Sequence, residues 1–216
     1  EVMAVSDVEV AEKMAPLLDD AILALYHGHQ EHTWTKSIID GVEAALADAG
    51  VHSRLKRPPA ICFLDLAGYT RLTAQHGDDR AAEMADQLAW IVQRTSGAHQ
   101  GRPVKWLGDG VMFHYSDPGL AVDAALVMMD ELEQMGLPPC HVGIHTGPVL
   151  FQAGDYYGQT VNLASRITDY ARPGEILVSA TVVAQADNSR ANFTDIGEVE
   201  LRGIPGAIHL YAAVKL

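Results

Sequence analysis

Residues 102–115 read RPVKWLGDGVMFHY, with extended runs at 102–106 and 111–115 on either side of a Gly-Asp-Gly turn. Because Asp-Gly tolerates the positive φ that a tight turn needs, this stretch predicts a β-hairpin. A third apolar run, 60–66, is interrupted only by Asp65 near its end, which is typical of a buried strand. Together the three runs predict the middle of a β-sheet.

Helical and extended segments continue the pattern outward from these strands. Apolar residues recur with helical spacing in three segments, and further extended runs lie between them. The predicted helices are 78–100, 119–135 and 158–170, and the predicted extended runs are 141–151 and 175–179. This order of elements predicts an α+β fold in which helices pack against a mainly antiparallel sheet.

The first quarter of the chain has a different pattern. Apolar residues at three- and four-residue spacing predict two helices between residues 8 and 50, and the sequence RLKRPP at 54–59 is typical of an exposed linker. We therefore expect a helical N-terminal segment at 1–57, with a dimerisation or regulatory role, and a larger domain at 58–216. Two helices make a thin core and need a partner surface.

Composition and charge exclude several classes of partner. The chain has 216 residues, 48% of them hydrophobic and 20% charged, with a formal net charge of −13. Without clustered Lys and Arg, nucleic acid and anionic membrane are not expected partners. The two cysteines lie in apolar runs, and no stretch approaches the ~20 apolar residues that cross a bilayer. We therefore expect a cytoplasmic protein whose cysteines are free and buried, with no direct membrane contact from this segment.

Two carboxylates stand out in the strand and turn pattern. Asp65 nearly closes a buried run, where a charge is costly unless it is hydrogen-bonded or holds a cation. Asp109 lies at the hairpin tip between Gly108 and Gly110, which permit a sharp turn and a close backbone approach. If the two face each other across neighbouring strands, they form a platform for Mg²⁺. Ordinary turn chemistry is the alternative interpretation of Asp109.

A second set of polar residues has the spacing of a nucleotide site. Asn162 and Arg166 lie four residues apart on one face of a predicted helix, and Asp155 precedes that helix. The Arg guanidinium suits phosphate oxygens, and an Asn amide suits a ribose. Lys105 lies four residues before Asp109, roughly 13 Å along a strand, so the two can hardly grip one small group. Taken singly, each is also compatible with an ordinary solvated surface residue.

Three segments carry a resemblance to a known family. They are FLDLAGYT at 63–70, VKWLGDG at 104–110 and GDYYGQTVNLASR at 154–166. In this order and spacing they resemble the class III nucleotidyl cyclases, of the homodimeric bacterial adenylate cyclase type, from about residue 58 to residue 214. The resemblance implies a ferredoxin-like core for the catalytic domain.

The resemblance also implies a role for each matched residue. Asp65 and Asp109, with the backbone carbonyl of Leu66, are similar to the ligands of two divalent ions per active site, Mg²⁺ or Mn²⁺. Lys105 and Asp155 match the adenine-selecting positions, where Lys donates to the ring N1 and Asp accepts from the 6-amino group.

Two further matches concern the sugar and the phosphates. Asn162 resembles the residue that orients the ribose, and Arg166 the one that stabilises charge on the α-phosphate. The implied reaction is attack of the ribose 3′-oxygen of ATP on the α-phosphorus, which yields 3′,5′-cyclic AMP and pyrophosphate. The family builds each site between two subunits, so the resemblance implies a homodimer and a nearly inactive monomer.

One position departs from the family pattern. Many members carry a basic residue near the C-terminus that meets the terminal phosphates, whereas 203–211 offers only His209. His209, nearby Arg202 or the metals alone could serve, and a plain strand histidine is an equal interpretation. His114, His141 and His145 lie in predicted strands and are expected to be structural.

Other functions stay open as alternatives. A catalytically silent module that dimerises or senses nucleotide would keep the fold without the reaction, and a guanylate cyclase would prefer GTP. A phosphatase or other metal hydrolase built on Asp65 would be expected to show a DxD pattern, but residue 67 is Ala.

Overall fold

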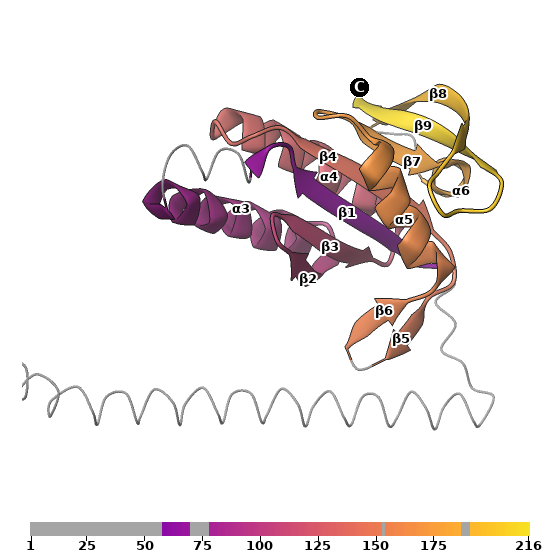
Figure 1. Ribbon diagram of the computed structural model, residues 1–216, viewed down its shortest axis with the longest axis horizontal. Helices are drawn as coiled ribbons and strands as arrows, with labels where there is room; N and C mark the ends of the chain where they lie inside the picture. The colour runs from indigo at the N-terminus through magenta and orange to yellow at the C-terminus, as the bar shows by residue number, and fades with distance from the viewer. Residues whose placement is uncertain (1–57, 70–77, 153, 187–190) are drawn as a thin grey trace, which may run out of the picture. The chain divides into compact units, whose positions relative to one another are not determined.

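The computed structural model describes residues 58–69, 78–152, 154–186 and 191–216 (Figure 1). The helical segment predicted at 1–57 lies outside these residues and stays a prediction. The elements in chain order are β1 (Ala60–Leu66), α3 (Asp78–Ala98), β2 (Gly101–Leu107), β3 (Gly110–Tyr115), α4 (Pro118–Gln134), β4 (Cys140–Thr146), β5 (Leu150–Gln152), β6 (Asp155–Tyr157), α5 (Gln159–Tyr170), β7 (Ile176–Ser179), α6 (Ala180–Val183), β8 (Ala191–Glu200) and β9 (Ala207–Lys215).

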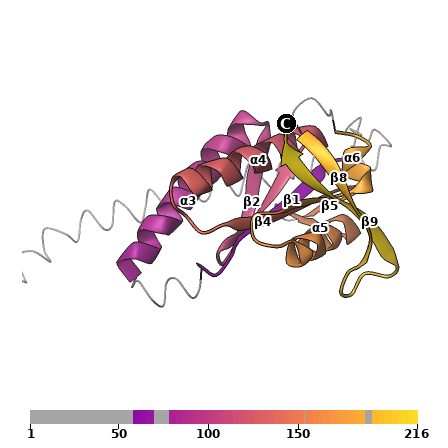
Figure 2. The same cartoon turned by 90° about the horizontal axis from the view of Figure 1, so that it is seen from above.

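A seven-stranded sheet in the order β2-β3-β1-β4-β7-β9-β8 forms the centre of the domain. Every neighbouring pair in it is antiparallel except β4 and β7. Helices α3 and α4 cover one face of the sheet and α5 covers the other (Figure 2). The predicted α+β fold with a mainly antiparallel sheet is therefore confirmed.

Strand β1 is buried on both faces, as its apolar run predicts. Alternate side chains, among them Leu64 and Leu66, enter the core that α3 and α4 share with the sheet. Ile61 and Phe63 point to the other face, where they pack with Ala164 of α5. Since side chains alternate along a strand, Asp65 belongs to the α5 face.

The boundaries differ from the predicted ones where glycine and proline break the chain. The run 141–151 is not one strand, because Gly147-Pro148 separates β4 from β5. The positive φ of the hairpin is at Gly108, at 71°, and not in the Asp-Gly pair. The long antiparallel pair of β8 and β9 was not predicted as a hairpin.

The two cysteines behave as small core residues. Cys62 and Cys140 are buried free thiols, as expected. Burial raises the pKa of the Cys140 thiol to about 12 and that of Cys62 further still, so both stay protonated at neutral pH. Among the described helices, none combines the length and the apolar character that crossing a bilayer requires.

His114 and His145 lie on the α5 face of the sheet, in the row that also contains Ile61. Burial lowers the pKa of each imidazole to about 4, and the charge of Arg102 contributes for His114. His145 also bonds to the Ser179 hydroxyl, with Nδ1 and Oγ 2.7 Å apart. Both rings are therefore neutral in the folded protein near pH 7, which supports their expected structural role.

This titration predicts how stability depends on pH. In the unfolded chain the two histidines titrate near pH 6.5, so between about pH 6.5 and 4 the unfolded state binds more protons than the folded state. The free energy of unfolding should therefore fall as pH drops through that window, by at most about 1.4 kcal/mol per pH unit for each histidine. Urea unfolding of a His114→Gln, His145→Gln double variant should show a flatter slope.

A third histidine provides a control outside this pH window. The pKa of His209 is raised in the folded protein, so its contribution to stability is lost only as pH rises above about 6.5, and His209→Gln should leave the slope between about pH 6.5 and 4 unchanged. An unchanged slope in the double variant would contradict the assignment of the effect to His114 and His145.

Candidate active site

Asp65 leaves the core at the end of β1. Its side chain is 41% exposed, whereas Ile61 and Phe63 on the same face are buried. Leu66 follows with its side chain buried, so it can offer a ligand only its backbone carbonyl. Asp65 is therefore the charged residue of β1, and it lies where the strand reaches the protein surface.

The neighbours of Asp65 are set by strand register. Asp65 pairs with Gly110 of β3 on one side and with His141 of β4 on the other. A Cβ atom at Gly110 would lie 2.8 Å from Oδ1 of Asp65 and 3.2 Å from the Leu64 carbonyl oxygen. A side chain at this position would force the Asp65 carboxylate to move. On the other side, Nε2 of His141 lies 3.3 Å from Oδ2 of Asp65, so this histidine, expected to be structural only, adjoins the site.

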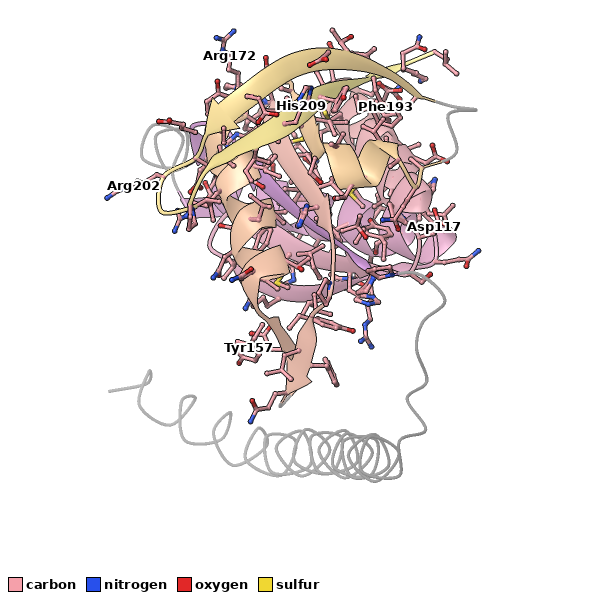
Figure 3. The ribbon with its side chains drawn as sticks, turned by 90° about the vertical axis from the view of Figure 1, so that its right-hand side faces the viewer. Asp117, Tyr157, Arg172, Phe193, Arg202 and His209 are labelled. Atoms are coloured by element: carbon pink, nitrogen blue, oxygen red, sulfur yellow. The ribbon has the colours of Figure 1, made fainter. Side chains whose placement is uncertain are left out.

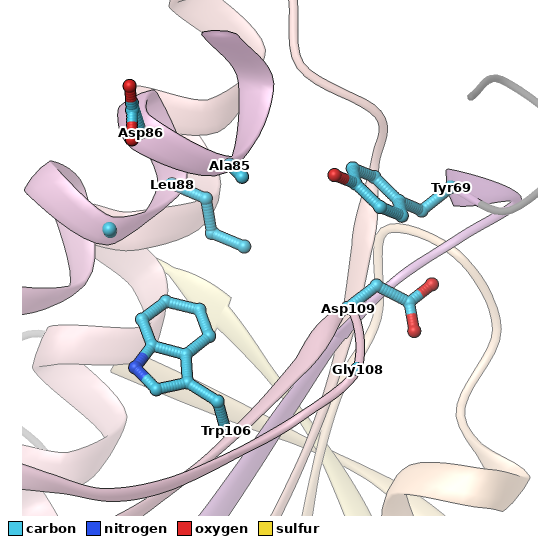
Figure 4. A pocket seen from close by; sticks show the side chains of 8 residues that line it. Tyr69, Ala85, Asp86, Leu88, Trp106, Gly108 and Asp109 are labelled. Carbon is cyan, nitrogen blue, oxygen red and sulfur yellow. The ribbon is translucent and has the colours of Figure 1, made fainter. Parts of the chain in front are cut away.

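Asp109 lies in the turn between β2 and β3, one residue before the partner of Asp65. The structure therefore brings the two carboxylates to the same end of neighbouring strands. Asp109 also lines a cavity of about 250 Å³ with Tyr69, Leu88 and Trp106. In Figure 4 its carboxylate is directed away from Trp106.

This end of the sheet fits a divalent ion. Two carboxylates and a backbone carbonyl are the hard oxygen donors that Mg²⁺ and Mn²⁺ prefer, with phosphate and water oxygens completing the coordination. No cluster of three or more His, Cys, Asp or Glu suited to a metal occurs within the described part of the chain.

Lys105 and Asp155 meet across the α5 face of the sheet. Nζ of Lys105, on β2, lies 2.6 Å from Oδ2 of Asp155, on β6. The two side chains are 34% and 23% exposed, so the pair is partly shielded from water. Two residues fifty positions apart thus form one donor–acceptor pair. Lys105 is thus paired and only partly exposed, and its role toward a ligand stays a prediction.

Helix α5 presents Asn162 and Arg166 on its exposed face. Its other face packs closely on β4, because a Cβ at Gly143 would lie 2.3 Å from the Thr168 amide nitrogen. Arg166 pairs with Asp169, with 2.5 Å between Nη1 and Oδ2. Exposed pairs of this kind contribute about 0–1 kcal/mol, so the guanidinium can turn to a ligand at little cost.

The predicted site residues fall into two groups. Asp65 and Asp109 lie at the β1 and β3 ends, and the second group comprises Lys105, Asp155 and the exposed face of α5. Within 58–69, 78–152, 154–186 and 191–216, no hydrogen bond or ion pair joins one group to the other. The division of these residues into a metal pair and a substrate set stays a prediction.

The C-terminal cations do not join either group. Nε2 of His209 lies 2.8 Å from Oδ1 of Asp195, and Nδ1 lies 3.2 Å from Oε1 of Glu198. The bond to Asp195 is the main reason that the pKa of His209 is raised. Arg202 is exposed on the loop between β8 and β9 and points away from the sheet (Figure 3). Engagement of both ring nitrogens disfavours His209 as a phosphate ligand.

Sequence reasoning missed two residues beside the Lys105–Asp155 pair. Arg102 donates a hydrogen bond to the Tyr156 hydroxyl, which joins β2 to β6 a second time. Strict alternation would place Arg102 and Lys105 on opposite faces of β2. A bulge between Pro103 and Lys105 brings both to the same face, and a proline within a strand run is the one sequence signal of it.

The sequence is similar to those of nucleotide cyclases. Residues 51–214 match the family described as the adenylate and guanylate cyclase catalytic domain. An adenylate cyclase of Streptomyces coelicolor is 29% identical over 160 residues, covering 74% of this chain and 42% of the relative. A pH-sensitive adenylate cyclase of Mycobacterium tuberculosis, MT1302, is 29% identical over 209 residues, covering 94% and 51%. The chain spans about half the length of these relatives.

Solved structures share the fold. The adenylyl cyclase CyaB from P. aeruginosa superposes with a TM-score of 0.65 at 21% identity, covering 73% of this chain and 94% of that one. The catalytic core of a rhodopsin-guanylyl cyclase with converted specificity, in complex with ATPαS, gives 0.68 at 18% identity, covering 74% and 96%.

The contact between Gly110 and Asp65 can be tested directly. Gly110→Ala should lower the free energy of unfolding by about 1–3 kcal/mol, because the new methyl group overlaps a carboxylate and a backbone oxygen. Gly97→Ala is the matched control, since nothing lies within 4 Å of its Cβ position in α3, and it should be neutral or stabilising by up to about 1 kcal/mol. Urea unfolding measures both, and equal effects would contradict the close contact.

Proposed function

Because this chain belongs to the family of adenylate and guanylate cyclase catalytic domains, we propose that it is an adenylate cyclase, which converts ATP into 3′,5′-cyclic AMP and pyrophosphate. The observation that carries the choice of base is the contact between Lys105 and Asp155. A lysine donor and a carboxylate acceptor side by side match the N1 acceptor and the 6-amino donor of adenine. Guanine presents the opposite order, with an acceptor at position 6 and a donor at position 1.

Binding of adenine would replace the direct bond between Lys105 and Asp155 with one bond from each side chain to the base. Without nucleotide, Lys105 and Asp155 satisfy each other at 2.6 Å. When the purine edge enters between them, the ammonium donates to N1 and the carboxylate accepts from the amino group. Each of these partly shielded groups keeps a partner in both states, so neither bears the full cost of desolvation. A base with the reversed order would leave both groups unpaired.

Asp65 and Asp109, with the Leu66 carbonyl, would hold two divalent ions, Mg²⁺ or Mn²⁺. When bound, such ions supply charge neutralisation at the phosphates and lower the pKa of a hydroxyl that coordinates them. Gly110 leaves space for the Asp65 carboxylate, and His141 lies against its other oxygen. These two neighbours limit the directions in which that carboxylate can turn.

The exposed face of α5 would act on the sugar and the α-phosphate. Asn162 would orient the ribose so that its 3′-oxygen faces the α-phosphorus in line with the leaving pyrophosphate. Arg166, released from its exposed pair with Asp169, would donate to the phosphoryl oxygens on which charge builds in the transition state. Positioning and electrostatic stabilisation would together supply the rate enhancement.

We propose that each site is completed by a second copy of the chain. No bond among the described residues joins the carboxylate pair to the substrate set, which supports a division between subunits. A closed two-fold dimer would then hold two equivalent sites, each with the metal pair of one subunit and the substrate residues of the other.

The activity is tested on the purified protein with Mn²⁺ and either ATP or GTP, with mass detection of the cyclic nucleotide. We expect cyclic AMP from ATP in excess over cyclic GMP from GTP. Asp109→Ala should abolish the product, whereas Asp130→Ala, an exposed aspartate paired with Lys215 on the far side of the domain core, should leave it unchanged. No product from either nucleotide, with ATP still bound, would instead identify a silent nucleotide-sensing module.

Shared sites make a separate prediction. Asp65→Ala and Arg166→Ala proteins should each be inactive alone, and mixing them should restore activity through the one intact site of each heterodimer. Random exchange of equal amounts gives half heterodimers with one of two sites intact, hence about a quarter of the wild-type rate. Absence of recovery in heterodimers isolated with two affinity tags would contradict sites shared between subunits.

A further inference from the structure

In the described part of the chain, no strand pairing joins the hairpin that carries Asp155 to the main sheet. Among the described strands, β5 and β6 pair only with each other, in a two-stranded sheet. Apart from its two chain connections, the position of this hairpin over β2 and β3 therefore depends on side chains. Figure 1 shows the hairpin extending beyond the end of α5.

Tyr156 is the buried side chain of β6, 6% exposed. Its ring stacks on that of His114 of β3, with centroids 4.6 Å apart and planes 14° apart. It also contacts Phe151 of β5, with centroids 4.9 Å apart. Its hydroxyl accepts a hydrogen bond from Nη2 of Arg102, whose guanidinium carbon lies 5.6 Å from the centre of the Tyr156 ring. Arg102 and His114 thus hold the hairpin to the sheet.

The same tyrosine is linked to the carboxylate that faces adenine. The Tyr156 amide donates to Oδ1 of Asp155 at 2.8 Å, while Lys105 donates to Oδ2 at 2.6 Å. Because the bulge in β2 places Arg102 and Lys105 on one face, two contacts run side by side from β2 to β6. One joins Arg102 to Tyr156 and the other joins Lys105 to Asp155.

We propose that Arg102 and Tyr156 are positioning residues for purine selection, which keep Asp155 in register with Lys105 when the base separates the two. This inference rests on the proposed function. In the free protein both contacts hold the hairpin, but adenine replaces the direct bond between Lys105 and Asp155. The contact between Arg102 and Tyr156 then remains as the side-chain hydrogen bond between β2 and β6 among the described residues, beside the weaker contact of the Lys105 ammonium with the Tyr157 ring.

The neutral state of His114 is compatible with this arrangement. Its imidazole pKa is lowered to about 4, first by burial and then by the charge of Arg102. At the pH of an activity assay the ring is uncharged, so it stacks on Tyr156 without repelling the guanidinium beside it. The cluster therefore leaves the Arg102 charge free to bond the Tyr156 hydroxyl.

The test uses Tyr156→Phe, which removes the hydroxyl and keeps the stacked ring, and Arg102→Met, which removes the guanidinium. Each should raise the KM for ATP and lower the ATP-over-GTP preference by about three- to ten-fold. This range is expected because only part of the energy of the lost charge-assisted hydrogen bond affects binding of the base. The kcat should change less than about two-fold, because contacts to the base are the same in the ground state and in the transition state. The double variant should be no worse than either single one, because both remove the same contact.

Two controls separate positioning from folding. Arg102→Lys keeps a donor and should lose less than Arg102→Met. Tyr211→Phe removes the hydroxyl of a tyrosine on β9, which lies at the other end of the sheet from β2, and should leave KM and base preference unchanged. Equilibrium binding of 3′-deoxy-ATP and 3′-deoxy-GTP, which cannot cyclise, gives a second readout that does not need turnover.

The outcomes distinguish the two proposals. If the wild type makes no cyclic AMP but binds 3′-deoxy-ATP, the proposed activity fails, and the positioning role stands or falls on the change in analogue affinity. Unchanged KM, analogue affinity and base preference in Tyr156→Phe would overturn the positioning role while leaving the cyclase intact. A fall in kcat and melting temperature alone would also overturn it, since it would indicate a purely structural contact. If neither analogue binds to the wild type, both proposals fall.

Discussion

A carboxylate cannot be buried without a partner, and this constraint determines where β1 ends and what surrounds it. The strand is apolar on both faces up to Asp65, which emerges beside the ends of β3 and β4. Glycine at position 110 leaves the carboxylate in place, because a larger residue would displace it or the strand. The turn that contains Asp109 follows from the same register. The charged residue near the end of β1 thus limits which residues its two neighbouring strands can place beside it.

The elements that the sequence predicts are those whose burial is periodic. The doubly buried run of β1 and the helical spacing of α5 locate Asp65, Asn162 and Arg166 without any tertiary information. The contact between Lys105 and Asp155 is different, because two side chains fifty residues apart meet only through packing of a hairpin on the sheet. The bulge after Pro103 reverses the alternation of β2, so the face on which Arg102 lies could not be read from spacing.

Cations in the substrate set are already neutralised in the free protein. Lys105 is paired with Asp155, and Arg166 with Asp169. In a chain with a net charge of −13, such pairing leaves little positive potential to attract a triphosphate. Divalent ions held by the carboxylate pair would then be the main source of attraction for the phosphates. Affinity for the nucleotide and affinity for the metal would accordingly depend on each other.

The open sheet also has two outer strands, β2 and β8, whose free backbone groups could add a strand from another molecule. Each carries features that oppose such growth. Strand β2 has a proline, a bulge and two cationic side chains, and β8 has a bulge between Asp195 and Gly197 with acidic residues around it. The bulge that brings Arg102 and Lys105 together over the hairpin therefore also protects the protein from edge-to-edge aggregation.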